Sequence, residues 1–205
     1  MTQRNYLRKY FIMGSQDCDR DPEIILQEAI NAGITAFQFR EKGKGSLNGE
    51  AKIDLGKKLR VLCRHYNIPF FINDDVDLAI TLDVDGIHVG QEDEKIANLR
   101  IEFPNLLIGL SVSNEEELKR SPLHLVDYIG AGPIFETTSK DDAKAAVGTY
   151  WIKYLRNKHH YLPIVGIGGI NTSNAHQVIE AGADGVAVIS AITKSEDIYT
   201  TVNSL

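Results

Sequence analysis

Short runs of apolar, β-branched or aromatic residues recur along the chain and alternate with segments that carry helix signals. Asp21, Pro22 and Glu23 predict the start of one helix that ends near Gly33. Asn171 and Thr172 predict the start of another that ends near Gly182. The runs predict eight strands, at residues 10–14, 34–40, 69–73, 86–90, 107–112, 128–134, 163–168 and 185–190.

Strands that alternate with helices pair in parallel through right-handed crossovers, and eight such units predict a closed (β/α)8 TIM barrel. An open dinucleotide-binding sheet is the weaker alternative, because its nearest glycine fingerprint, residues 166–171, ends in Asn171 instead of glycine. The length allows roughly 26 residues per unit, so we expect a single α/β domain over residues 1–205. Residues 135–149 are polar, aperiodic and too long for a tight turn, which predicts a mobile active-site loop.

Composition narrows the class of protein. Hydrophobic residues make up 43% of the chain and charged residues 24%, as in ordinary globular proteins. The 28 acidic and 22 basic residues give a net charge of -6, which argues against a nucleic-acid or membrane partner. Cys18 and Cys63 stand outside any disulfide or zinc spacing, and no secretory signal or membrane span is present in the sequence. We therefore expect a cytoplasmic protein.

Polar residues gather where the early predicted strands end, which is where TIM barrels place their reactive groups. The twofold side-chain period puts Gln38 and Arg40 on one face of their strand and Phe37 and Phe39 on the other. If the phenylalanines meet the helices, Gln38 and Arg40 point into the barrel. Arg40 could form a strand-end ion pair there, but an amide and a guanidinium buried together favour an anionic ligand.

Acidic residues follow the next two predicted strands. Asn73, Asp74 and Asp75 end one strand, and one of them is expected to cap the helix that begins near Val76. Asp93 follows the neighbouring strand and could by itself be a helix-start carboxylate. Because adjacent units share one rim, we predict that Asp74 and Asp93 face one Mg²⁺ ion.

The late strands carry features of phosphate sites. Gly168 and Gly169 permit close approach of backbone N–H groups, although tight packing would explain them equally well. Ser190 ends the last strand, and the loop 137–140 adds three hydroxyls and a lysine, which could also be merely solvated. His88 lies within a strand and is predicted to be a hydrogen-bonded core histidine outside the site.

These motifs, in this order, resemble the thiamine-phosphate synthase family, also called thiamine-phosphate pyrophosphorylase. The resemblance runs nearly end to end. Its blocks are residues 38–42 (Gln-Phe-Arg-Glu-Lys), 73–75 (Asn-Asp-Asp), 85–93, 109–111, 130–134, 163–170 and 185–192.

The resemblance implies an enzyme with two small-molecule substrates, a pyrimidine diphosphate and a carboxylated thiazole phosphate. Their coupling gives thiamine phosphate, pyrophosphate and carbon dioxide, with one Mg²⁺ per site held by Asp74 and Asp93. The diphosphate contacts implied are Gln38, Arg40, Lys42, Asn73, Ser111 and Lys140, with Phe39 and Glu41 included as members of the same block. The thiazole-phosphate site implied is Thr137, Thr138, Ser139, Gly169, Ile189 and Ser190.

Catalysis in such a site is expected to consist of stabilising the leaving pyrophosphate, with Arg40, Lys42, Ser111 and Lys140 as the catalytic residues. The thiazole nitrogen attacks as a neutral nucleophile, so no general base and no Ser-His-Asp or Cys-His set is expected.

Two positions depart from the family pattern. Glu136 stands where the family usually has proline in the loop, and it adds a negative charge and backbone freedom that bear on loop closure and thiazole-phosphate binding. Ser113 stands where many members have histidine. The related thiazole tautomerase uses such a histidine for proton transfer, so Ser113 argues against that alternative. A non-catalytic sensor of a phosphorylated thiazole is a further alternative, but it would not need the Mg²⁺ acids. The sequence leaves the oligomeric state open.

Overall fold

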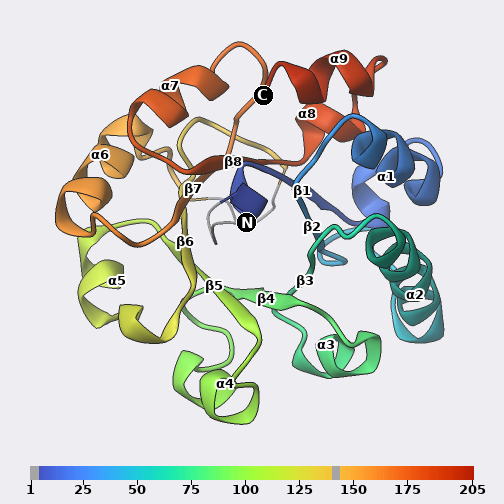
Figure 1. The fold of residues 1–205 in the computed structure, drawn as a ribbon, viewed down its shortest axis with the longest axis horizontal. Helices are drawn as coiled ribbons and strands as arrows, with labels where there is room; N and C mark the ends of the chain where they lie inside the picture. Colours follow the sequence, from blue (N-terminus) through green and yellow to red (C-terminus); the bar gives the residue numbers. More distant parts are fainter. Residues whose placement is uncertain (1–4, 140–143) are drawn as a thin grey trace.

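A closed barrel of parallel strands forms the centre of the molecule, and helices surround it (Figure 1). The computed structural model describes residues 5–139 and 144–205. Each strand pairs with its neighbours in chain order, and β1 pairs with β8 to close the barrel. The predicted (β/α)8 TIM barrel is confirmed. The strands are β1 (Lys9–Met13), β2 (Ala36–Phe39), β3 (Phe70–Asn73), β4 (Gly86–Val89), β5 (Leu107–Val112), β6 (Tyr128–Ala131), β7 (Ile164–Ile167) and β8 (Gly185–Val188).

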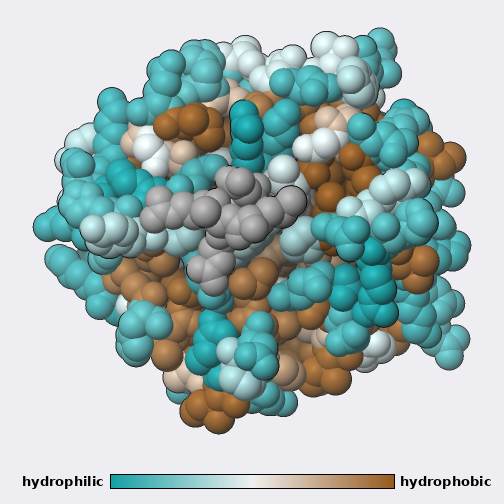
Figure 2. Space-filling model, viewed as in Figure 1, coloured by the Kyte–Doolittle hydropathy of each residue, from teal (hydrophilic) through white to brown (hydrophobic). Residues whose placement is uncertain are grey.

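The helices lie outside the barrel, and short 3-10 turns supplement them at Asn5–Leu7, Ser15–Asp17 and Leu123–Leu125. None of the helices among the described residues is both long and apolar enough to span a membrane. They are α1 (Pro22–Asn31), α2 (Gly49–His65), α3 (Val76–Leu82), α4 (Ile96–Glu102), α5 (Glu115–Arg120), α6 (Gly148–Lys158), α7 (Ala175–Glu180), α8 (Ser190–Thr193) and α9 (Ile198–Asn203). Figure 2 shows the same face of the molecule, with hydrophilic residues along most of its edge.

Most element boundaries follow the sequence prediction, and the differences have local causes. Asp21 caps α1 through the N–H of Glu23, as expected. The run 128–134 ends as a strand at Ala131, because Pro133 has no N–H to give to a ladder. The helix expected at Asn171 begins only at Ala175, since the side chain of Asn171 accepts a hydrogen bond from the N–H of Ser173 and stabilises a turn instead.

The twofold period of the strands divides the apolar residues into two cores. Phe37 and Phe39 belong to the outer core between strands and helices. Tyr10, Phe71 and Tyr128 belong to a smaller cluster inside the barrel. The prediction that alternate residues of β2 face opposite sides is therefore confirmed.

One hydrogen-bonding arrangement, called a clamp below, recurs at the amino ends of the strands. In each copy an aspartate just before an even-numbered strand accepts from the N–H of a residue at the start of the preceding strand and from an arginine of an outer helix. The distances to the backbone N–H are all 2.8 Å, and those to the arginine are 2.5–2.7 Å. The three clamps are Arg60–Asp85–Phe70, Arg100–Asp127–Ile108 and Arg156–Asp184–Ile164.

The first two strands carry a reduced form of the same clamp. Thr35, just before β2, accepts from the N–H of Lys9 at 2.8 Å, and its hydroxyl takes the place of the carboxylate. The clamps thus repeat with every second βα unit and fasten the end of the barrel opposite the carboxyl ends of the strands.

Candidate active site

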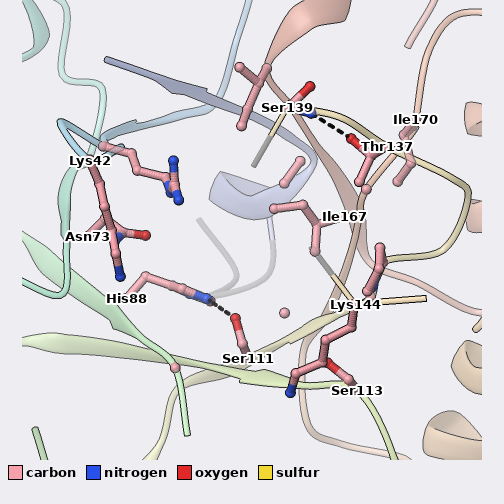
Figure 3. Close-up of a pocket in the computed structure, with 18 of the residues that line it drawn as sticks. Lys42, Asn73, His88, Ser111, Ser113, Thr137, Ser139, Lys144, Ile167 and Ile170 are labelled. Atoms are coloured by element: carbon pink, nitrogen blue, oxygen red, sulfur yellow. Dashed lines mark hydrogen bonds between the residues drawn. The ribbon is translucent and has the colours of Figure 1, made fainter. Parts of the chain in front are cut away.

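A cavity of about 530 Å³ lies at the carboxyl ends of the strands. The residues that end or follow β2 to β8 line it, as expected for a TIM barrel. Figure 3 shows Lys42 and Asn73 on one side of this cavity, with Thr137 and Ser139 across from them. The sequence-predicted residues that line it are Arg40, Lys42, Asn73, Asp74, Asp93, Ser111, Thr137, Ser139, Gly169, Ile189 and Ser190.

The residues at the ends of β2 to β5 form one side of the cavity, called the early side below. Arg40 and Lys42 supply positive charge to it. Arg40 directly follows β2, and its N–H donates to the carbonyl of Met13, which continues the pairing with β1. The Arg40 side chain is only 5% exposed yet reaches the cavity. Lys42 Nζ lies 2.5 Å from Asp74 Oδ2. A buried guanidinium beside a lysine makes this side suited to an anion.

Three members of the predicted substrate-binding block do not line the cavity. Gln38 points into the barrel as predicted, but it lies below the cavity and donates to the Tyr10 hydroxyl at 2.8 Å. Phe39 packs in the outer core, close to Gly56 of α2. Glu41 accepts hydrogen bonds from the N–H groups of Ser15 and Leu47, at 2.8 and 2.6 Å. The structure places the side chains of Phe39 and Glu41 with the scaffold, because the twofold period that turns Arg40 inward turns its neighbours away.

The acidic pair lies beside these cations. Asp74 follows β3 with a left-handed backbone (φ 60°), and its N–H donates to the carbonyl of His88. Asp93 is held by the N–H of Gly90, which donates to its Oδ2 at 2.7 Å. Burial raises the pKa of Asp74, the Asp93 carboxylate raises it further, and Lys42 only partly opposes this. Two carboxylates are therefore held close together at a cost that a bound cation would offset.

The residue types of this pair fit Mg²⁺. The described residues contain no group of three or more His, Cys, Asp and Glu side chains that could hold a metal ion. Mg²⁺ is commonly bound by one or two carboxylates and completes its coordination with water and substrate phosphate oxygens. Asp75 stands apart from the pair because it caps α3 through the N–H of Leu78, which confirms that one of the three polar residues serves as the cap.

His88 and Ser111 form part of the cavity floor. His88 Nε2 lies 2.9 Å from Ser111 Oγ (Figure 3). Its Nδ1 lies 3.0 Å from the hydroxyl of Tyr128. His88 is thus hydrogen-bonded and 8% exposed, as predicted, and it also lines the cavity. Glycines in the neighbouring strands provide the room, since a Cβ on Gly109 would lie 2.5 Å from His88 Nδ1.

Hydroxyl groups converge on the opposite side of the cavity. Ser139 Oγ lies 3.3 Å from Ser190 Oγ, and the N–H of Ser139 donates to Thr137 Oγ1 at 3.2 Å. Thr138 lines an adjoining cavity, together with Ser139 and Ser190. Two segments that are distant in sequence, the loop after β6 and the residues after β8, therefore meet here.

The late glycines are explained by close packing as well as by the cavity. Gly169 has φ 63°, and a Cβ there would lie 2.4 Å from the carbonyl oxygen of Glu136. Gly168 has φ 96° and would bring a Cβ to 2.5 Å from Pro133. The loop after β6 therefore rests on the backbone after β7, and only glycine permits this approach.

Lys144 is a cavity residue that the sequence did not indicate. Its Nζ donates to Glu117 Oε1 at 2.6 Å, and Glu117 also accepts from the N–H of Ser113. A single lysine in a polar loop does not by itself indicate a cavity residue. Its partner lies on α5, 27 positions away, and no local sequence pattern links the two. Lys140 lies outside the described residues, and the mobility expected for residues 135–149 stays a prediction.

Comparison with known proteins gives a consistent picture. The sequence model of a family described as thiamine monophosphate synthase matches residues 9–192. A thiamine-phosphate synthase of Oceanobacillus iheyensis is 60% identical over 202 residues, which are 98% of each chain. A thiamine-phosphate synthase of Anoxybacillus flavithermus is 54% identical and covers 94% of this chain and 89% of its own.

Solved structures agree with these sequence relatives. A thiamine phosphate pyrophosphorylase from Pyrococcus furiosus superposes with a TM-score of 0.87 at 36% identity, covering 98% of this chain and 95% of that one. A phosphoribosyl anthranilate isomerase from Thermotoga maritima has a TM-score of 0.68 at 15% identity over 97% of this chain and 96% of that one, a likeness of fold alone.

Proposed function

Because the chain belongs to the thiamine-phosphate synthase family and is a transferase of thiamine biosynthesis, we propose that it joins a pyrimidine diphosphate to a thiazole phosphate in this cavity. The substrates are 4-amino-2-methyl-5-(diphosphooxymethyl)pyrimidine and the carboxylated form of 4-methyl-5-(2-phosphoethyl)thiazole. The products are thiamine phosphate, pyrophosphate and carbon dioxide.

The chemistry of this coupling requires charge stabilisation more than proton transfer. The bond between the pyrimidine CH₂ and the diphosphate oxygen breaks first, and pyrophosphate leaves with the electron pair. The electron-rich aminopyrimidine stabilises the CH₂ cation, and the thiazole nitrogen then forms the new C–N bond. The bond between the thiazole ring carbon and its carboxylate breaks to release carbon dioxide, and that carbon takes up a proton from solvent. A site for this reaction needs donors and cations around the leaving group, placed before the bond breaks.

The early side of the cavity has this character. Arg40, Lys42, Asn73 and Ser111 end or follow strands β2, β3 and β5 and line the cavity together. In the proposed reaction they hold the diphosphate, and Arg40 and Lys42 neutralise the charge that develops as it leaves. Lys140 belongs to the same proposed set but lies outside the described residues.

Asp74 and Asp93 would hold Mg²⁺ in this proposal. The ion when bound supplies positive charge to the pyrophosphate oxygens. The residues of the chain prepare its place, because the N–H of Gly90 fixes Asp93 and Lys42 fixes Asp74. The raised pKa of Asp74 supports the assignment, because burial and the neighbouring Asp93 carboxylate destabilise its charged form. A bound cation would offset this destabilisation.

The opposite side of the cavity, formed by residues that follow β6 to β8, is proposed to bind the phosphate of the thiazole. The hydroxyls of Thr137, Ser139 and Ser190 can donate to phosphate oxygens, and the backbone at Gly169 and Ile189 borders the same space. Thr138 is proposed to contribute from the adjoining cavity. These donors carry no charge, which suits a phosphate that is bound but not released.

The observation that carries the proposal is that the two sets line one cavity, with Lys42 and Asn73 of the first set across from Thr137 and Ser139 of the second (Figure 3). Arg40, Lys42 and the paired acids stand on one side, and the hydroxyls stand on the other, where Lys144 also lines the cavity. This arrangement supports the proposal that a diphosphate to be released binds opposite a phosphate to be retained, with the reacting ring atoms between them.

A direct assay tests the proposal. Purified protein is incubated with Mg²⁺ and both substrates, and pyrophosphate release and thiamine phosphate formation are measured. We expect both products in equal amounts, and we expect Asp74→Ala to lose most of the activity. Asp77→Ala is the matched control, because Asp77 is an exposed aspartate of α3 outside the cavity, and this variant should retain activity. A folded protein that forms no product with either thiazole tautomer would contradict the proposal.

A further inference from the structure

A line of hydrogen bonds crosses the inside of the barrel below the cavity. Gln38 Nε2 donates to Tyr10 Oη at 2.8 Å, and Tyr10 Oη lies 3.0 Å from Tyr128 Oη. Tyr128 Oη lies 3.0 Å from His88 Nδ1, and His88 Nε2 lies 2.9 Å from Ser111 Oγ. The line begins at a side chain on β2 that does not border the cavity and ends at two that do.

The first three members of the line are sealed from solvent. Gln38 and Tyr10 are each 1% exposed and Tyr128 is 0% exposed, among apolar residues of the inner cluster. Burial raises the pKa of both tyrosine hydroxyls, so each keeps its proton. A buried hydroxyl that keeps its proton must donate it, because water cannot reach it to accept a bond.

These conditions give the line a direction. The amide of Gln38 occupies an acceptor position of Tyr10, so Tyr10 donates to Tyr128. Tyr128 then has its own proton left, which it donates to Nδ1 of His88. An imidazole that accepts at Nδ1 carries its proton on Nε2, which points at Ser111.

The opposite direction is less favourable. If Tyr128 donated to Tyr10, the Tyr10 oxygen would accept from both Tyr128 and Gln38, and its own proton would point into the apolar interior. Leaving a buried donor unsatisfied costs the desolvation of that group. The packing of the amide of Gln38 therefore decides which way the whole line runs.

We propose that Tyr128, with Tyr10 behind it, is a positioning residue that holds His88 as the Nε2–H tautomer, so that Ser111 accepts from His88 and turns its own proton into the cavity. This inference rests on the proposed function, and there the Ser111 proton is donated to an acceptor atom of the bound pyrimidine diphosphate. The Ser111 backbone is held as well, because its carbonyl accepts from Gln91 Nε2 at 2.8 Å. What remains to be set is the direction of the Ser111 hydroxyl proton, and the hydrogen bond from His88 sets it.

The role is separable from packing. The Tyr128 ring contacts the rings of Tyr10, Phe71 and His88 at centroid distances of 6.0, 5.9 and 5.5 Å. Tyr128→Phe keeps these ring contacts and removes only the oxygen that joins the line. Tyr6→Phe is the matched control, because Tyr6 stacks on Phe71 in the same cluster and its hydroxyl is not part of the line.

The kinetic test is a double-mutant cycle on the full-length protein with Mg²⁺ and both substrates. We expect Tyr128→Phe to lower kcat about tenfold with little change in KM for the pyrimidine diphosphate, because one oriented donor is lost in the transition state. Ser111→Ala should lower kcat at least as much, and the double variant should be no slower than Ser111→Ala alone. Tyr6→Phe should match the wild type. Independent, multiplying effects of the two substitutions would overturn the proposal.

A spectroscopic test does not depend on turnover. The nitrogen resonances of ¹⁵N-labelled histidines, with His88 assigned from the spectrum of His88→Gln, report which ring nitrogen carries the proton. We expect His88 protonated at Nε2 in the wild type and a shift toward the other tautomer in Tyr128→Phe. A wild-type His88 protonated at Nδ1 would overturn the proposal. Absence of product from the wild type would instead contradict the proposed function, so the two failures are distinguishable.

Discussion

The clamp at Arg156 allows a stability prediction worked from the structure. Its guanidinium donates to Asp184 Oδ2 and to the carbonyls of Gly182, His159, His160 and Leu162. Arg156→Met keeps most of the apolar stem of the side chain and removes all of these donors. The carboxylate of Asp184 then retains the N–H of Ile164 but loses the guanidinium of Arg156.

The expected loss follows from burial. The side chains of Arg156 and Asp184 are 21% and 13% exposed, so the pair is mostly but not fully removed from water. Removing one partner of a buried pair costs about 3–5 kcal/mol, and the remaining exposure lowers this to about 3 kcal/mol. For a chain of 205 residues this corresponds to a fall in Tm of roughly 6–12 °C.

The assay is urea and thermal unfolding followed by circular dichroism. Arg64→Met is the matched control, because Arg64 and Asp83 form an ion pair whose side chains are 62% and 88% exposed. Its loss should cost less than about 1 kcal/mol. At a temperature where both variants are folded, kcat should be unchanged in each, since both residues lie away from the cavity. Equal destabilisation by the two substitutions would refute the reasoning from burial.

Three further predictions concern the cavity. Asp93→Asn should raise the Mg²⁺ concentration for half-maximal activity at least about tenfold, measured by titration, because one of two carboxylates is lost while Asp74 remains; an unchanged titration would contradict the assignment. Burial raises the pKa of Glu117, but Lys144 and backbone donors outweigh it and hold the pKa below its usual value. The stability difference between the wild type and Lys144→Met should therefore be full at neutral pH and disappear as pH falls below about 4.3 and through the lowered pKa, measured by urea unfolding; a difference that persists in acid would contradict it. Gly169→Ala should cost about 1–3 kcal/mol and raise KM for the thiazole phosphate, because it combines a positive φ with a backbone clash; unchanged stability and KM would show that the loop moves aside freely.

The barrel and the two sides of its cavity could be predicted from the sequence because both rest on local patterns. The strand runs and their twofold period placed Arg40 in the cavity and Phe37 against the helices. The same period separates Phe39 and Glu41 from the cavity, although the family resemblance groups them with Arg40 in one contiguous block. Side-chain direction alternates within such a block, so its members do not share one role.

The line from Gln38 to Ser111 could not be predicted in this way. Its members come from β1, β2, β4, β5 and β6, and the contact between Tyr10 and Tyr128 joins residues 118 positions apart. Only closure of the barrel brings these side chains together. One signal was nevertheless present, since glycines inside strands, such as Gly109 and Gly130, mark places where a neighbouring side chain needs room. The neighbours are Tyr128 and His88 at Gly109, and His88 at Gly130.

The repetition of the clamps separates two kinds of damage that a substitution can do. Each Arg–Asp clamp contributes only to the free energy of unfolding. A stabilising substitution elsewhere in the chain can restore that free energy. A clamp variant should therefore be rescued by many second-site suppressors that need not lie near it. In the proposed reaction the cavity residues are not interchangeable, because each cation, acid and hydroxyl would face a different atom of the substrates. Suppressors of a cavity variant should be rare and should lie beside the lost group, so a suppressor screen would map the division between the two ends of the barrel.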